Sequence, residues 1–329
     1  MAKHTQLYQL TPDKNLLMQC NVIRTRNDKV IVIDGGHILE EYCYYIHAAI
    51  RAILGLKENE FFEVEAWILT HDHEDHLGEL CLQLEKYTNE SNFVIHNFYF
   101  DFADLETAGY PQVEKDAMRP YHVRFEQALA HYAQVRGIPV KSGSYYQDLN
   151  GAVVNAKAIK KGLTIAVDNV ELQFLQTRDE ADDIINSSSL VFKMTARDEN
   201  GDVENTVMFL GDTSKGSGER LLKNVDNSLL RSDIVQMAHH GNWACDKTVY
   251  DAIGAKMHVW PTPLWVWDWT NPQYDIPTVR EWVGAKTTAD ENNLVACLYE
   301  YYPENRTSVS DWKKALPYMC LNIPLSRKT

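Results

Sequence analysis

The chain lacks the cysteine patterns of a disulfide framework or of a thiolate metal site. Its six cysteines are scattered along 329 residues, and no two of them form a CxxC pair. A chain of this length can bury a large core and needs no disulfide staples. We therefore expect free thiols in a reducing compartment, at Cys20, Cys43, Cys81, Cys245, Cys297 and Cys320.

Long apolar runs and low-complexity tracts are also missing. The first ten residues, MAKHTQLYQL, hold no apolar stretch of signal-peptide length. No later segment approaches the roughly 20 apolar residues that span a bilayer. There is no linker rich in Gly, Pro and Ser and no close internal repeat. We expect a soluble, cytoplasmic protein without membrane contact, formed as one domain over 1–329 with 260–329 less constrained. The oligomeric state is left open.

Basic residues are too few for a protein that holds long nucleic acid. Lys and Arg number 32 against 46 Asp and Glu, which gives a formal net charge of −14. Neutralising many phosphates requires the opposite balance. With 45% hydrophobic and 24% charged residues, the composition is that of a globular protein and excludes general disorder.

Strand and helix patterns alternate in both halves of the chain. Strands are expected at TQLYQL, MQCNVIRTR, KVIVIDGG, VEAWILT and NFVIHNFYF, and later at GLTIAV, NVELQFLQT, SSLVFKMTAR, VENTVMFLGD, DIVQMA and KMHVWPT. Helices are expected at 38–56, 77–87, 124–136, 218–223 and 247–253. This order predicts an α/β fold in which two sheets pack face to face with helices outside, as a four-layered αββα sandwich.

The strongest motif, HDHEDH at 71–76, directly follows the apolar strand VEAWILT. Alternate side chains at a strand end share one side, so His71 and His73 can reach one metal at about 2.0–2.1 Å. Asp75 and His76 then face a second position. With 12 His in the chain, HxHxDH arises by chance in roughly one random sequence in a thousand. A His-rich surface turn is therefore the weaker interpretation.

Further ligand types stand at two other strand ends. Asp212 ends TVMFLGD, where a carboxylate could bridge two cations. His239 and His240 follow DIVQMA and precede Gly241, which lets the backbone approach closely. Alone, Asp212 would indicate a turn or helix cap and the His pair a solvated loop. Together with HDHEDH they predict a dinuclear metal centre.

The segments IDGG, THDHEDHLGEL, FLGD and MAHHG, in this order over about 30–242, resemble the metallo-β-lactamase superfamily of di-metal hydrolases. The resemblance implies the αββα sandwich of that family. It implies for the first metal His71 and His73, for the second metal Asp75, His76 and one of His239 or His240, and for the bridge Asp212. Asp34 matches the family's acidic residue that supports the metal loop by hydrogen bonding.

One departure concerns a further metal-binding His that the family usually has before the bridging Asp. The corresponding stretch, QTRDEADDIINSSSLVFKM, contains no His. Asp182, Asp183 or Asn186 could fill the position, and Asp183 is counted among the candidate ligands. The alternative is a capped turn before a strand. INSSSLVF followed by FLGD and AHHG is similar to the competence-type and phosphorylcholine-esterase-type subset.

A site of this kind implies a hydrolase. Two cations ~3.5–4 Å apart lower the pKa of a shared water, which Asp75 can orient. The member of the His239–His240 pair that is not a ligand can donate a proton. Zn is expected first, and Mn or Fe suit the same ligands. A small anionic phosphodiester is the expected substrate. The alternatives are a carboxylic ester, thioester or lactam, then an iron redox or sensing protein, then a non-catalytic module.

A Trp-rich segment, VWPTPLWVWDWTNPQYDIP, leaves two interpretations open. Aromatic residues dominate protein cores and interfaces, which favours a core strand or a protein interface. An aromatic wall beside the substrate could instead stack on a base or enclose a quaternary ammonium group. Candidate substrate-binding residues are Trp243, which follows the His pair, and Trp265, Trp267 and Trp269.

Overall fold

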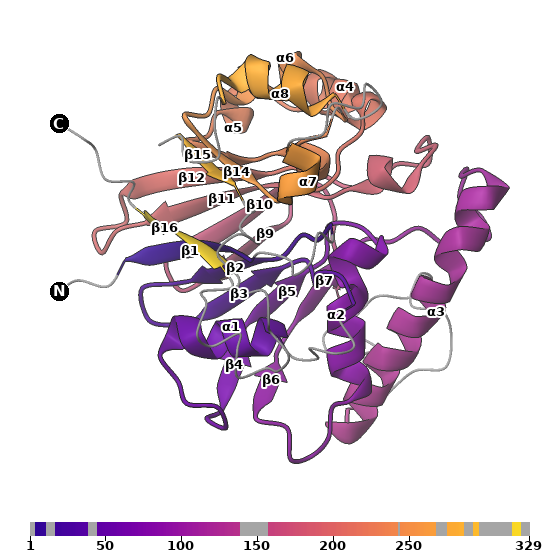
Figure 1. Ribbon diagram of the computed structural model, residues 1–329, viewed down its shortest axis with the longest axis vertical. Coiled ribbons are helices and arrows are strands. Elements are labelled where there is room, and N and C mark those ends of the chain that lie inside the picture. The colour runs from indigo at the N-terminus through magenta and orange to yellow at the C-terminus, as the bar shows by residue number, and fades with distance from the viewer. Residues whose placement is uncertain are drawn as a thin grey trace.

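The computed structural model describes residues 4–10, 17–38, 45–138, 157–242, 244–267, 275–285, 292–295 and 318–323. Two seven-stranded mixed sheets in these ranges lie face to face, and helices cover their outer faces (Figure 1). Three apolar clusters separate four layers: one under each set of helices and one between the sheets. The predicted αββα sandwich is confirmed.

The first sheet begins with an antiparallel meander and continues with parallel strands. Its order is β16 (Tyr318–Ile323), β1 (Thr5–Leu10), β2 (Asn21–Arg24), β3 (Val30–Ile33), β5 (Ala66–Ile68), β7 (Phe98–Phe100) and β8 (Lys157–Ala158). The turn between β2 and β3 passes through Asp28 with φ 62°, a conformation that Asp tolerates better than most residues. The strand at the C-terminal end of the chain thus pairs with the first one.

The second sheet combines antiparallel hairpins with parallel strands. Its order is β15 (Asn293–Val295), β14 (Met257–Trp260), β13 (Ile234–Gln236), β12 (Val203–Phe209), β11 (Val191–Arg197), β10 (Val170–Gln176) and β9 (Thr164–Val167). Strands β12 to β15 run parallel to one another. Parallel strands bring their carboxyl ends to one edge of a sheet, so the loops after β12, β13 and β14 are neighbours.

Helices on each outer face bury the apolar side chains that alternate along the strands. In β3, Val30 and Val32 face the helices, while Ile31 and Ile33 face the other sheet. The first sheet is covered by α1 (Tyr45–Leu54), α2 (Glu74–Glu85) and α3 (Gln112–Val135). The second is covered by α4 (Lys215–Asn224), α5 (Asn227–Leu230), α6 (Lys247–Ile253), α7 (Leu264–Trp267) and α8 (Ile276–Val283).

Two predicted elements differ in the structure. NFVIHNFYF is not one strand: β6 (Phe93–Ile95) pairs with β4 (Phe62–Val64) in a small separate sheet, and β7 joins the first sheet. The break has a cause, since the amide of His96 donates to Val64 and the side chain of Asn97 donates to Glu65. Helix α3 starts at Gln112 rather than at 124, so the predicted start was wrong because the helix continues through Pro120.

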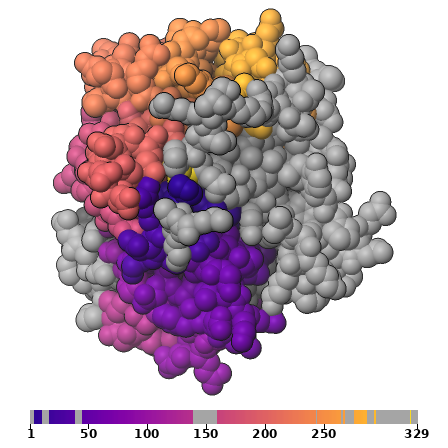
Figure 2. Space-filling model, turned by 90° about the vertical axis from the view of Figure 1, so that its left-hand side faces the viewer, coloured from indigo at the N-terminus to yellow at the C-terminus, as the bar shows by residue number. Residues whose placement is uncertain are grey.

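Free thiols are confirmed at three positions, since Cys20, Cys81 and Cys245 are buried and unpaired by disulfides. In the parts of the chain that the structure describes, no helix combines the length and the apolar character needed to cross a membrane. Figure 2 shows one side of the molecule, with the earlier half of the chain (indigo to purple) stacked against the later half (orange). The loops at the strand ends meet between these halves.

Candidate metal centre

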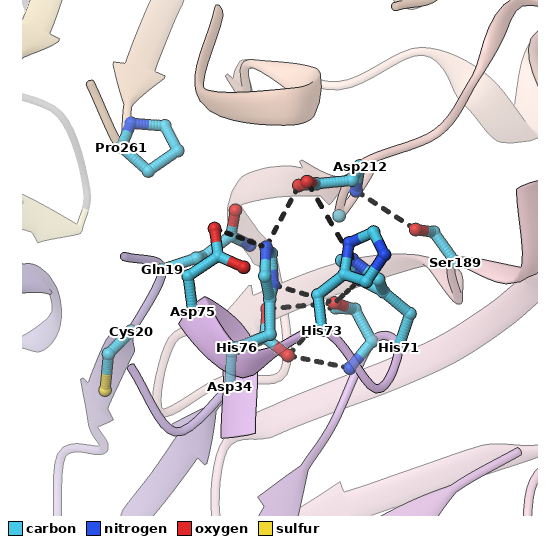
Figure 3. Close-up of polar contacts among 12 residues, drawn as sticks. Gln19, Cys20, Asp34, His71, His73, Asp75, His76, Ser189, Asp212 and Pro261 are labelled. Carbon is cyan, nitrogen blue, oxygen red and sulfur yellow. Dashed lines mark hydrogen bonds and ion pairs between the residues drawn. The ribbon is translucent and has the colours of Figure 1, made fainter. Parts of the chain in front are cut away.

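The predicted ligand loops converge from both sheets onto one place. HDHEDH follows β5 of the first sheet, while Asp212 follows β12 and the His239–His240 pair follows β13 of the second. Figure 3 shows the side chains of His71, His73 and His76 and the carboxylates of Asp75 and Asp212 directed toward one another. Residues far apart in the sequence thus form a single polar cluster at the edge of the sandwich where these strands end.

The first group of ligand atoms lies around His71. Its Nε2 is 3.1 Å from Nδ1 of His73 and 3.8 Å from Oδ2 of Asp212. His71 and Asp212 are buried, with side chains 0% and 2% exposed. Ligand atoms with bonds of about 2.0–2.1 Å to one cation lie at comparable separations.

The second group lies around His76 and His240. Nε2 of His76 is 3.2 Å from Oδ1 of Asp212 and 3.8 Å from Oδ2 of Asp75. Nε2 of His240 is 2.9 Å from Oδ2 of Asp75 and 3.7 Å from Oδ2 of Asp212. Asp212 therefore contacts both groups, with its Oδ2 near His71 and His240 and its Oδ1 near His76, which is the arrangement of a bridging ligand.

Unsatisfied buried atoms show that these residues fit a metal. Nε2 of His76 and Oδ1 of Asp212 are fully buried and lie 3.2 Å from each other, with no other hydrogen-bond partner among the described residues. Buried polar atoms of this kind are costly unless a partner satisfies them. The two clusters, His71–His76–Asp212 and Asp75–His76–His240, are consistent with a dinuclear metal site. Imidazole and carboxylate donors without cysteine suit Zn, Mn and Fe.

Asp34 supports the loop as its motif implied. It lies at the end of β3 with φ 60°, and its carboxylate accepts from the backbone amide of Thr70 at 2.7 Å and from the Thr70 hydroxyl at 2.9 Å. It also accepts from Nδ1 of His76 at 2.9 Å. Trp67 donates from Nε1 to the Asp34 carbonyl. Burial raises the pKa of Asp34, although His76 and Thr70 oppose that shift.

The electrostatics of the cluster favour a bound cation. Burial alone would lower the pKa of His76, but Asp212, Asp34 and Asp75 overcome it and raise that pKa well above its ordinary value. Burial acts to raise the pKa of Asp75 and of Asp212, yet neighbouring His76 and His240 hold both below the ordinary Asp value. The cluster therefore collects positive charge, which protons or metal ions can supply.

The loop after β14 orients His240. Nδ1 of His240 hydrogen-bonds the Pro261 carbonyl at 2.8 Å, and the Thr262 hydroxyl donates to the His240 carbonyl. With Nδ1 engaged by the Pro261 carbonyl, Nε2 is the ring nitrogen that faces Asp75 and Asp212, where it can donate to Asp75 or, once deprotonated, ligate a cation. Gly241, at φ 81°, lies against Trp260, where an added Cβ would come within 2.4 Å of the indole ring. The close backbone approach predicted for this glycine is confirmed.

Several supporting residues carried no sequence signal. Gln236 is buried at the end of β13, where its side-chain oxygen accepts from the amides of Leu210 and Gly211 and its amide donates to the Met237 carbonyl. It thus ties the loop of Asp212 to the loop of His240. Ser189 accepts from the Asp212 amide. A lone Gln or Ser in a strand or turn shows no pattern that could have identified either role.

Asp72 is a further anchor within HDHEDH. In the sequence it stands between His71 and His73. Its side chain is buried and forms an ion pair with His122 of α3. The longest helix of the first sheet is thereby attached to the ligand loop. The pairing joins residues from two elements, so the motif spacing alone could not have predicted it.

The residues proposed for the missing ligand lie outside the two clusters. Asp182 is buried and accepts from Arg220 at 2.6 Å, so its charge is already paired. Asp183 is exposed and accepts from the Ser187 hydroxyl. Oδ1 of Asn186 is buried without a hydrogen bond among the described residues. The ligand role of Asp183 stays a prediction, and its geometry gives it no support.

The Trp-rich segment is partly described. Trp267 is 3% exposed and packs edge-on against Trp260, with Arg280 over its ring. These contacts favour the core interpretation for Trp267. Trp243, Trp269 and the side chain of Trp265 lie outside the described residues. Their role as substrate-binding residues stays a prediction.

Known proteins similar to this chain were found among solved structures. No protein-family model matches the chain, and no curated protein does. Similar solved structures include the metallo-β-lactamase fold protein YhfI from Bacillus subtilis, at 11% identity and TM-score 0.44 over 89% of this chain and 98% of that one. A metallo-β-lactamase from Cronobacter sakazakii, a HARLDQ motif mutant, is 13% identical, with TM-score 0.38 over 84% and 89%.

A third similar structure is the diiron β-hydroxylase CmlA from Streptomyces venezuelae, 11% identical with TM-score 0.40 over 79% of this chain. The chain spans about half the length of CmlA: the match covers 45% of the CmlA chain, and 46% of the chain of a CmlA mutant. Similarities of this size say nothing about metal, substrate or activity. The layer order and the order of the ligand loops are nevertheless those that the resemblance to the metallo-β-lactamase superfamily implied.

Proposed function

We propose that the chain is a metal-dependent hydrolase of the metallo-β-lactamase type with a dinuclear centre. The observation that carries this proposal is the position of Asp212. Its Oδ2 is 3.8 Å from His71 and its Oδ1 is 3.2 Å from His76, so one carboxylate faces both ligand groups. Bridging carboxylates of this kind are typical of paired-metal hydrolytic sites.

The metal ions, Asp75 and His239 have separate roles in this proposal. Two divalent cations, held by the His and Asp side chains of the two groups, would supply an activated water and neutralise charge on a substrate oxygen. Asp75, whose side chain is 19% exposed, can accept a hydrogen bond from that water and hold its orientation. His239 has a side chain that is 30% exposed, so it lies at the solvent-facing side of the cluster.

A small phosphodiester is the substrate we propose. INSSSLVF, FLGD and AHHG occur together, as in the competence-type and phosphorylcholine-esterase-type subset. The net charge of −14 disfavours a long nucleic acid, because binding one would require many contacts from Lys and Arg. Cations at the centre could still attract a single anionic group in an acidic protein.

Metal analysis and a substrate panel test the proposal. The protein is purified without added metal, its metal content is measured, and the metal-free form is reloaded with Zn, Mn or Fe. We expect up to two ions per chain, and turnover of a bis-aryl phosphate faster than of the matching aryl ester or a β-lactam. A protein that binds no transition metal contradicts the whole proposal. A tenfold preference for the ester retains the hydrolase and rejects the phosphodiester.

A further inference from the structure

We propose that His239 is a ligand of the first metal and takes the place of the ligand that the stretch 176–194 lacks. The inference rests on the proposed dinuclear function. His71, His73 and Asp212 provide three ligands to the first position, whereas Asp75, His76, Asp212 and His240 provide four to the second. The question is which side chain completes the first position.

The stretch 176–194 does not supply that side chain. Its buried acid, Asp182, is held by Arg220, and Asp183 is exposed. Ser189, which does reach the site, uses its Oγ to accept from the Asp212 amide. The amide oxygen of Asn186 is buried without a hydrogen bond among the described residues, but imidazole and carboxylate are the donors that such metals prefer, which favours a ligand from another loop.

His239 is placed to provide it. Its Nε2 lies 3.8 Å from Oδ2 of Asp212, an oxygen that also lies 3.8 Å from Nε2 of His71 and 3.7 Å from Nε2 of His240. The ring of His239 makes no hydrogen bond to any described residue, so its lone pair is not committed elsewhere. His240, in contrast, is fixed in the second group by Pro261 and Asp75.

The backbone explains how two adjacent residues reach two metals. His239 has φ 50° and ψ 52°, and His240 has φ 56° and ψ 23°, so both occupy the left-handed region that non-glycine residues rarely adopt. The conformation is held by hydrogen bonds from the His239 amide to Gly211 and from the Asn242 amide to the His239 carbonyl. Both imidazoles are thereby directed to the same side, with ring centres 6.1 Å apart. Backbone strain of this kind concentrates at functional sites.

Metal content of a His239→Asn variant is the first test. Asn is chosen because it tolerates the left-handed conformation better than most residues but is too short to replace the imidazole. We expect wild-type protein to hold two ions, and the variant to hold one and to bind the other at least ~100-fold more weakly in a chelator competition. Retention of both ions at wild-type affinity would overturn the inference while leaving the hydrolase proposal intact. Absence of metal from the wild type would instead defeat the proposed function.

Matched variants identify the ligand directly. His37→Gln, at a His 4.0 Å from Glu74 but outside both clusters, should keep both ions, as should Asp183→Asn. Loss of one ion in Asp183→Asn, but not in His239→Asn, would assign the position to Asp183 and overturn the inference. His239→Cys loaded with Co²⁺ should show a thiolate-to-metal charge-transfer band that His37→Cys lacks. A two-cobalt His239→Cys protein without that band would show that residue 239 does not touch the metal.

Discussion

The imidazole of His76 donates from Nδ1 to the carboxylate of Asp34 at 2.9 Å, and this contact directs its Nε2 toward Asp212. Both side chains are fully buried, so water does not compete for the bond. The Asp34 carboxylate also accepts from the amide of Thr70, the residue just before the ligand motif. One buried acid thus orients a ligand and fixes the start of the ligand loop.

Replacing Asp34 by Asn should weaken metal binding without removing a ligand. The Asn amide group would place a donor opposite either the Thr70 amide or His76 Nδ1, so one of the two hydrogen bonds is lost. We expect metal affinity to fall about 10–100-fold. Chelator competition on metal-loaded protein measures the change, and Asp251→Asn, at an exposed acid, is the control. Equal affinity in Asp34→Asn and wild type would contradict the role of Asp34.

Removing the first pair of imidazoles should remove the first metal. His73→Ala should abolish binding at the first position, because it leaves that position one ligand short, while the fold stays largely intact. Elemental analysis and circular dichroism measure the two effects. If a His71→Ala, His73→Ala double variant retained the full metal content, the ligand assignment would be wrong.

Asp212→Ala tests the bridge. Loss of the shared carboxylate affects both positions, so we expect turnover of a bis-aryl phosphate to fall by at least ~100-fold. Steady-state kinetics with saturating metal measure kcat and KM separately. Asp251→Ala changes an acid that only pairs with Lys247 on the surface of α6, and it should keep wild-type kinetics. A decrease of less than tenfold for Asp212→Ala would count against bridging.

His47 predicts a pH dependence of stability away from the metal centre. It lies in α1, buried against Phe62 and Phe93. Burial, and to a smaller extent the positive charge of nearby Arg51, lower its pKa well below the ordinary 6.5. The folded state therefore keeps His47 neutral, while the unfolded state takes up a proton below pH 6.5. Above pH 6.5 the protonation of His47 does not reduce the free energy of unfolding. Below pH 6.5 the free energy of unfolding falls by about 1.4 kcal/mol per pH unit through this residue.

A His47→Leu variant isolates this contribution. Urea unfolding at pH 7.5 and at pH ~5.5 should show a smaller loss of stability in the variant, by about 1 kcal/mol. Comparing the two proteins cancels the titration of the metal-site histidines, which both retain. The same pH dependence in both proteins would show that His47 is not the group responsible.

The acidic net charge predicts a preference for small substrates. Rates are compared on a dinucleotide or small alkyl phosphodiester and on long duplex DNA across a salt series. The small diester should be cleaved faster, with little dependence on salt, because the metals and their neighbours would provide most of the binding. Rapid duplex cleavage at low salt that collapses as salt rises would reveal a basic groove that the net charge of −14 conceals.

Part of this arrangement was predictable from the sequence because it is local. Continuous apolar runs in KVIVIDGG and VEAWILT indicate strands with two buried faces, and hence helices outside two sheets. HDHEDH sets two imidazoles on one side because the spacing along an extended chain requires it. Similar local signals placed Asp212, His239 and His240 at strand ends and predicted the closely packed Gly241.

Only the tertiary structure decided what depends on contacts between distant segments. NFVIHNFYF could not be divided between two sheets without knowing that His96 and Asn97 bond Val64 and Glu65. Trp267 could not be placed in the core without its contact to Trp260. His239 and His240 are adjacent and chemically identical. The sequence alone therefore shows that a His pair follows β13, but not which contacts each imidazole makes. The Pro261 carbonyl and the left-handed backbone, both products of tertiary packing, decided that His240 contacts Asp75.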